Sequence, residues 1–183
     1  MLKSSRLLLR SWSLADASDL FEYAQREEVG PNAGWKPHRT EEESKQIIRL
    51  FLMKAEVYAI LLPDLNKVIG SIGLHSYKGE KSSGLKELEI GFALHPDYWG
   101  LGIMPEAVQL ILEHGFNQLD ADVIWCGRFD FNDRSGRVQE KCGFTYRYKK
   151  MEQLKAFEEM TVTSLYYAIT KAEYKERKRT ESL

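Results

Sequence analysis

The sequence predicts one α/β domain, in which a single mixed β-sheet carries helices on its faces. Apolar, β-compatible runs alternate with helical patterns in the order βααβββαβαββ. The chain has 183 residues, which is long enough to bury a core without metals or disulfides. No repeat, low-complexity block or linker interrupts it, so we expect one domain over residues 1–183, with a core at 6–170 and a charged tail at 171–183.

Strands and helices of the first half are predicted by apolar patterning and by capping residues. The elements expected up to residue 84 are a strand at 6–12, a helix at 13–28, a loop at 29–38, a helix at 40–55, strands at 56–63 and 67–77, and a polar turn at 78–84. Either Ser13 or Asp16 caps the first helix. Thr40 and Glu43 have the spacing of a capping box and open the second helix.

The second half is predicted in the same way. The elements expected here are a strand at 86–96, helices at 104–118 and 132–144, and strands at 121–129, 144–151 and 160–170. The strand at 86–96 becomes wholly apolar, as a central strand does. Asn132 is the candidate N-cap of the last helix, and Gly143 is its expected C-terminal stop.

Composition and charge exclude several classes of protein. The net charge of −1 gives no overall attraction to nucleic acid or to an anionic membrane. No apolar run reaches the length of about 18 residues that a membrane span needs, and the opening MLKSSRLLLRSW is typical of a strand rather than a signal peptide. Cys126 and Cys142 lack metal-ligand spacing and are expected to be reduced thiols. We therefore expect a cytoplasmic protein with no metal.

A turn with two glycines joins the predicted central strand to the helix that follows. The first N–H groups of a helix are unpaired and carry a partial positive charge. Glycines at this point let the backbone approach a ligand and adopt angles closed to other residues. The amides that could wrap a pyrophosphate are those of Gly100, Leu101, Gly102, Ile103 and Met104. The segment is neither a Walker loop nor a dinucleotide fingerprint, so a plain tight turn is the alternative.

Three segments in order resemble the GNAT superfamily of acetyl-CoA-dependent N-acyltransferases, and within it the RimJ/RimL type that acetylates ribosomal-protein N-termini. They are RLLLRSWSLADASDLFEY, ELEIGFALHPDYWGLGIMPEA and NDRSGRVQEKCGF. The resemblance covers residues 6–170 and implies the GNAT fold, a mostly antiparallel sheet of about seven strands that is splayed at its central strands. It also implies acetyl-CoA as co-substrate and direct transfer to a primary amine. Trp99 occupies the first position of the family's loop motif, and Met104 departs from the small residue usual at the last.

The same resemblance gives roles to residues of the central strand. The backbone of Phe92, Ala93 and Leu94 would pair with the pantetheine arm, and an N–H there would face the thioester oxygen. Glu89 is the candidate base for the proton of the amine. Glu87 shares its strand face, so Glu87 or a water chain stays open as the base.

Further roles fall on the helix at 132–144. Ser135 is the candidate acid for the departing thiolate, because Gln139 stands where many relatives have a tyrosine. Asn132 would hydrogen-bond the pantetheine. Plain capping by Asn132 and an exposed helix hydroxyl at Ser135 are the alternatives.

Other polar side chains carry weaker expectations. Three histidines are expected to be structural, namely His75, His95 and His114. The early loop could border the acceptor cleft through Trp35, Lys36 and His38.

The sequence says less about the acceptor than about the donor. The resemblance favours the α-amine of a protein N-terminus, such as that of a ribosomal protein. Acetylation of a small molecule (a polyamine, antibiotic or metabolite) and a catalytically silent acyl-CoA-binding module stay open. A homodimer through the sheet edge or the C-terminal strands is the oligomer considered.

Overall fold

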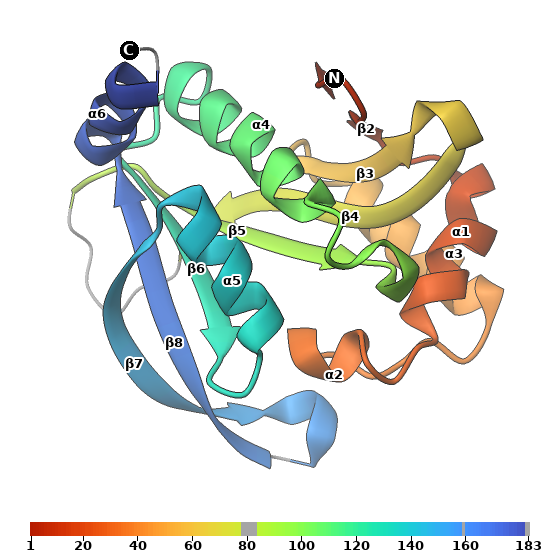
Figure 1. Ribbon diagram of the computed structural model, residues 1–183. Helices are drawn as coiled ribbons and strands as arrows, with labels where there is room; N and C mark the ends of the chain where they lie inside the picture. Colours follow the sequence, from red (N-terminus) through yellow and green to blue (C-terminus); the bar gives the residue numbers. More distant parts are fainter. Residues whose placement is uncertain (78–83, 159, 182–183) are drawn as a thin grey trace.

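The computed structural model describes residues 1–77, 84–158 and 160–181. These residues form one eight-stranded sheet with helices on both faces (Figure 1). Its strands are β1 (Leu2–Lys3), β2 (Leu8–Ser11), β3 (Val57–Leu62), β4 (Lys67–Ser76), β5 (Glu87–Leu94), β6 (Val123–Phe129), β7 (Thr145–Leu154) and β8 (Met160–Thr170). The α-helices are α1 (Ala17–Ala24), α2 (Gly30–Ala33), α3 (Glu41–Leu52), α4 (Ile103–Asn117), α5 (Asp133–Cys142) and α6 (Lys171–Glu181). The predicted turn at 78–84 falls almost wholly outside the described residues.

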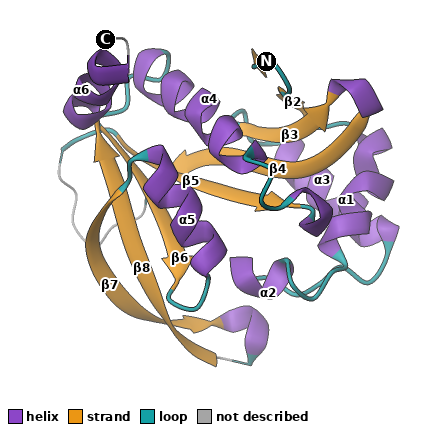
Figure 2. Cartoon of the chain, viewed as in Figure 1, coloured by secondary structure: helices purple, strands orange, loops and turns teal. Residues whose placement is uncertain are grey.

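The strand order β1-β2-β3-β4-β5-β6-β8-β7 confirms the mixed, mostly antiparallel sheet. Among the described strands, β5 and β6 are the one parallel pair, and they pair only from Glu87↔Val123 to Glu89↔Trp125. Beyond Glu89, β5 stays paired with β4 as far as Leu94. Beyond Trp125, β6 stays paired with β8 as far as Phe129. The predicted splay is therefore a fork between β5 and β6, which opens in Figure 2 toward α2.

Two apolar cores hold the layers together, one on each face of the sheet. The larger one packs α4 against the central strands, through residues such as Ile90, Ile111 and Ile124. The smaller one packs α1 and α3 against β3 and β4, through residues such as Leu20 and Ile48. Successive side chains of a strand point to opposite faces. Leu94 accordingly belongs to the first core, and its neighbour Ala93 packs against the second.

The predicted caps are mostly confirmed. Ser13 and Asp16 form a reciprocal capping box at a 3-10 turn, Leu14–Asp16, that leads into α1. The Thr40 hydroxyl accepts from the Glu43 N–H at 3.1 Å. The carboxylate of Glu43, however, accepts from the Arg39 N–H at 2.7 Å rather than from Thr40. The first two predicted helices also end earlier than expected, at Ala24 and Leu52.

The segment at 29–38 was expected to be a loop, and this is wrong for its first part, which forms α2. Pro31 lies in the first turn of α2, where its fixed φ suits the helix and its missing N–H costs no hydrogen bond. Gly34 then ends the helix with a φ of +85°. The result is a single helical turn that lies at the open end of the fork (Figure 1).

The charged segment at 171–183 was expected to be a tail, and this is also wrong, because residues 171–181 form α6. Thr170 and Glu173 cap it reciprocally, with Thr170 N–H to Glu173 Oε2 at 2.7 Å and Glu173 N–H to Thr170 Oγ1 at 3.2 Å. The ring of Tyr174 stacks on Phe116 of α4 with centroids 4.8 Å apart. This contact docks α6 on the larger core.

Candidate functional site

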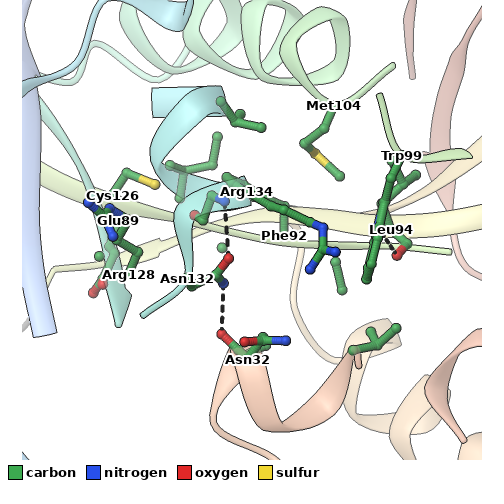
Figure 3. Close-up of a pocket in the computed structure, with 18 of the residues that line it drawn as sticks. Asn32, Glu89, Phe92, Leu94, Trp99, Met104, Cys126, Arg128, Asn132 and Arg134 are labelled. Carbon is green, nitrogen blue, oxygen red and sulfur yellow. Dashed lines mark hydrogen bonds between the residues drawn. The ribbon is translucent and has the colours of Figure 1, made fainter. Parts of the chain in front are cut away.

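A cavity of about 340 Å³ lies where β5 and β6 diverge (Figure 3). Residues 90–94 of β5 line one side and residues 126–128 of β6 line the other. The remaining lining residues come from α2 and the segment before it, from α5 and its N-cap, and from the start of α4 and the turn before it. They include Glu28, Asn32, Trp99, Met104, Asn132, Arg134 and Ser135. The fork therefore creates a partly open cavity between two unpaired strand edges.

The glycine turn has the backbone shape that the sequence predicts. Gly100 has a φ of +79° and Gly102 a φ of +75°, in the left-handed region that favours glycine. Gly102 is the N-cap of α4, and no side chain caps the first turn of that helix. A Cβ built on Gly100 would meet nothing within 4 Å. The turn thus offers backbone amides on an open surface.

Arg6 braces this turn from the β1–β2 connection. Its Nη1 donates to the carbonyl oxygen of Leu101 at 3.1 Å. Its Nε donates to the Glu106 carboxylate, in the first turn of α4, at 2.8 Å. The Ser4 hydroxyl donates to the other oxygen of the same carboxylate at 2.6 Å. The carbonyl of the turn is thereby held by a cation.

Two side chains at the turn face the cavity from above in Figure 3. Met104 is buried in the larger core and also lines the cavity, so its side chain forms a wall instead of crowding the surface of the turn. Trp99 donates its indole N–H to the Leu94 carbonyl at 2.9 Å. The guanidinium of Arg134 lies over the Trp99 ring, 4.3 Å from its centroid. These contacts fix the turn before α4 to the end of β5 and to α5.

Glu89 lies at the point where the fork begins. It is half-buried and lines the cavity, and burial, followed by the charge of Glu152, raises the pKa of its carboxyl. A Cβ built on Gly127 would lie 3.4 Å from Glu89 Oε1, so the missing side chain leaves room for this carboxylate. Glu87 is instead held by the Trp125 indole N–H at 2.5 Å and is not among the lining residues. The structure therefore brings Glu89 to the cavity and leaves Glu87 outside it.

The helix α5 presents Ser135 and Asn132 from the opposite side. Ser135 is 8% exposed and lines the cavity. Asn132 caps the helix as predicted, since its Oδ1 accepts from the Ser135 N–H at 3.1 Å. Its Nδ2 donates to the carbonyl of Asn32 in α2 at 3.0 Å. Both interactions are drawn in Figure 3.

Gln139 lies in the core behind the cavity wall. Its side chain is fully buried, and Nε2 donates to the Cys126 carbonyl at 2.9 Å. It is not among the lining residues. Gln139 therefore ties α5 to β6 beneath the cavity.

Sequence reasoning missed His75. It pairs with Glu89 across β4 and β5, so the two side chains share a face, and it lines the cavity. Partial burial lowers the pKa of its imidazole, which favours the neutral ring. The sequence predicts the β3–β4 hairpin, but the proximity of His75 and Glu89 depends on the register between β4 and β5, which the sequence does not give.

The other histidines have structural contacts. His95 is buried and accepts from the Asp97 N–H at 3.1 Å. His114 Nε2 lies 2.8 Å from Glu56 Oε2.

The early loop borders the cavity through different residues from those expected. Trp35, Lys36 and His38 are not among the lining residues, whereas Val29 and Asn32 are. Trp35 instead packs against His38, with ring centroids 5.4 Å apart. The short helix α2 is what turns the segment toward the fork.

Within residues 1–77, 84–158 and 160–181, no three His, Cys, Asp or Glu side chains are grouped as a metal site would need. Cys126 and Cys142 are both free and buried. None of the helices in the described ranges has the length and apolar character that crossing a membrane would take.

The fold and the site define a class of protein. A sheet that forks beside a glycine-bearing helix N-terminus, with a half-buried carboxylate at the apex, suits a transferase whose co-substrate has a phosphate end and an extended arm. The chain matches the acetyltransferase (GNAT) domain over residues 6–145. It belongs to the GNAT family and is an acetyltransferase, with acetyl-CoA as its co-substrate.

Known proteins agree with this assignment. The chain is 31% identical over 143 residues to YnaD of Bacillus subtilis, described as an uncharacterized N-acetyltransferase, with 76% of this chain and 79% of YnaD covered. It is 26% identical over 149 residues to YoaA of the same organism, with a similar description, covering 79% and 82%. A GNAT acetyltransferase from Bacillus anthracis superposes with a TM-score of 0.81 at 28% identity, covering 94% of this chain and 99% of that one.

Proposed function

We propose that this enzyme transfers the acetyl group of acetyl-CoA directly to the α-amine of a protein N-terminus, such as that of a ribosomal protein. The observation that carries the transfer chemistry is that Glu89 of β5 and Ser135 of α5 line one cavity from opposite sides. The acceptor class is supported by the RimJ/RimL-like motifs. A ribosomal-protein-S5-alanine acetyltransferase from Vibrio fischeri shares the fold at 17% identity and a TM-score of 0.70, covering 92% of this chain and 95% of that one.

The residues present suit acetyl-CoA. Backbone amides of residues 100–104 would hold the pyrophosphate at the N-terminus of α4, where the partial positive charge of the helix favours an anion. The cavity edge at Phe92, Ala93 and Leu94 has no strand paired with it on the side of β6. Backbone groups there would pair with the amides of the pantetheine arm, as a neighbouring strand does. When bound, the co-substrate supplies an acetyl group activated as a thioester.

Proton transfers are assigned to two side chains. Glu89 takes the proton from the amine, either directly or through water, and its raised pKa makes it a better base than an exposed carboxylate. His75, its neighbour across β4 and β5, has a lowered pKa that favours the neutral ring, and it would orient the same amine by hydrogen bonding. Ser135 gives a proton to the departing sulfur. A backbone N–H of residues 92–94 would face the thioester oxygen and stabilise the charge that develops on it.

A small-molecule amine is the second candidate acceptor. It is favoured by α2, because Asn32 and Ala33 of this helix line the cavity and narrow the space left for an acceptor. The reading as a silent acyl-CoA-binding module has less support, since a candidate base and a candidate acid both reach the cavity. The buried, unpaired cysteines agree with a reducing compartment, and we place the enzyme in the cytoplasm.

The test is thiol release from acetyl-CoA against a panel of peptides with free N-termini, polyamines and aminoglycosides. We expect peptides to give the highest kcat/KM and Glu89→Gln to reduce it. A preference for polyamines or aminoglycosides would show that the acceptor is a small-molecule amine and not a protein N-terminus. No turnover with any acceptor, together with a normal thermal shift by acetyl-CoA, would support the binding module.

A further inference from the structure

One hydrogen bond joins the two halves of the molecule across the mouth of the cavity. Asn132, the N-cap of α5, donates from Nδ2 to the carbonyl of Asn32 in α2 at 3.0 Å, and the two residues are 100 positions apart in the chain. The orientation of the Asn132 amide is fixed by its two partners. The Ser135 N–H needs an acceptor, and the Asn32 carbonyl needs a donor.

The helix α2 has its other anchors on either side of this bond. The side chain of Asn32 donates to the Glu28 carbonyl at 2.8 Å, which ties α2 to the segment that connects it to α1. Gly34, just after α2, packs against Phe129 of β6, since a Cβ there would lie 3.3 Å from the Phe129 ring. The polar contact to Asn132 is thus what directs α2 toward α5, while Gly34 rests on β6.

The position of α2 decides the shape of the acceptor end of the cavity. Val29, Asn32 and Ala33 line the cavity opposite the turn before α4, as Figure 3 shows for Asn32 below and Trp99 above. A helix of one turn is not stable alone, so its placement depends on tertiary contacts. Losing the contact to Asn132 would leave this wall unfixed on the side that faces Ser135.

We infer that Asn132 is a positioning residue for the acceptor, which clasps α2 over the fork and so builds the wall against which the amine is held. This inference rests on the proposed function, because it concerns the acceptor half of the same cavity. It differs from a role for Asn132 in holding pantetheine alone. The amide has a second N–H, so one side chain can hold α2 and still face the co-substrate. Acceptor binding should therefore depend on Asn132 more strongly than acetyl-CoA binding does.

Two substitutions remove the hydrogen bond from Asn132 to the Asn32 carbonyl, which we call the clasp, and keep the helix cap. Aspartate and serine both cap helices as well as asparagine does, so Asn132→Asp and Asn132→Ser keep an acceptor for the Ser135 N–H. Neither has an amide N–H for the Asn32 carbonyl. Aspartate adds a charge and serine does not, so a result common to both comes from the lost donor. Asn117→Asp, at the exposed end of α4, is the control for the charge change.

The kinetic measurement is KM for acceptor and for acetyl-CoA, determined separately by thiol release. We expect KM for the acceptor to rise at least tenfold in both Asn132 variants, and to rise by a larger factor than KM for acetyl-CoA. Asn117→Asp should match the wild type. A rise in KM for acetyl-CoA with an unchanged KM for the acceptor would overturn the inference, and so would no change in either.

Hydrogen–deuterium exchange measured on the full chain tests the clasp without turnover. We expect faster exchange in residues 29–38 of Asn132→Asp and Asn132→Ser, with α5 unchanged. Unchanged exchange in residues 29–38 of both variants would contradict the inference. If no acceptor is turned over but exchange changes as expected, the proposed function fails while the clasp itself stands.

Discussion

Glu89 and Trp125 are the last paired residues of the parallel ladder between β5 and β6, and the cavity begins directly beyond them. The strand pairing therefore places one carboxylate at the apex of the fork, between two unpaired backbone edges. A carboxylate in that place is partly removed from water, which explains the direction of its pKa.

Replacing Glu89 by glutamine should lower kcat/KM by a factor of about 10² or more, since loss of a general base has that typical cost. In the wild type, kcat/KM should rise as the pH rises through the raised pKa of Glu89, because only the carboxylate accepts a proton. The measurement is a pH–rate profile with a fixed acceptor. Glu152→Gln removes the nearby negative charge and should move this rise to lower pH. An unchanged profile in Glu89→Gln would show that another group is the base.

The same residue should make stability depend on pH. The folded state holds the proton of Glu89 more tightly than the unfolded state, so the contribution of this group to stability is complete at low pH and is lost as the pH rises through the raised pKa. The difference in melting temperature between Glu89→Gln and the wild type should therefore favour the variant more at pH 8 than at pH 4. Thermal unfolding at both pH values measures this difference. An equal difference at the two pH values would contradict it.

Replacing Gly102 by valine should remove co-substrate binding. A β-branched residue at a φ of +75° costs about 1–2 kcal/mol and distorts the amides of the turn. The wild type should gain about 5–10 °C in melting temperature at an acetyl-CoA concentration about 100 times its Kd. The variant should gain none. Gly84→Val is the matched control, since Gly84 has the same φ of +75° and a Cβ there would meet nothing within 4 Å.

Replacing Ser135 by alanine should lower kcat by a factor of about 10² and leave KM for acetyl-CoA near its wild-type value, since the lost hydroxyl acts on the departing sulfur. The backbone N–H of residue 135 still bonds Asn132, so the helix cap is retained. Steady-state kinetics across the pH range provide the check. If the alanine variant turns over normally at every pH, Ser135 is not the acid.

Replacing Tyr174 by alanine should destabilise the protein by about 3 kcal/mol, because it removes a buried ring from the contact between α6 and α4. Denaturant unfolding measures this change. Tyr146→Ala, which truncates a ring on a residue that is 52% exposed, should cost much less. Equal effects of the two substitutions would mean that α6 does not contribute to the core.

Much of the fold follows from local signals. The hairpin of β3 and β4, the helix after the glycine turn and the cap at Asn132 depend on patterns a few residues long, and these are confirmed. The capping pair Thr170 and Glu173 was present in the sequence as T-x-x-E, and it would have predicted α6. Tyr174 is the buried residue of α6, so apolar periodicity alone gave little indication of a helix there.

The candidate site depends on contacts that local patterns do not contain. Glu87 and Glu89 share a strand face, and only the end of the β5–β6 ladder distinguishes them. The same is true of α2, because a single turn of helix containing proline and glycine resembles a loop until its partners are known. Its link to α5 spans 100 residues of chain. The backbone shape at Gly100 and Gly102 was predictable because glycine has no Cβ and adopts a positive φ at little cost.

The fork also has a mechanical consequence. Among the described strands, the β5–β6 ladder is the one that joins the first five strands to the last three, and it has three residue pairs. Shear along that boundary would be resisted mainly by side-chain packing and by the connections through α4 and α2. A ligand arm that bonds to both open edges would complete the missing part of the sheet. Pulling the chain from its two ends in a single-molecule experiment should then give a higher unfolding force with acetyl-CoA bound.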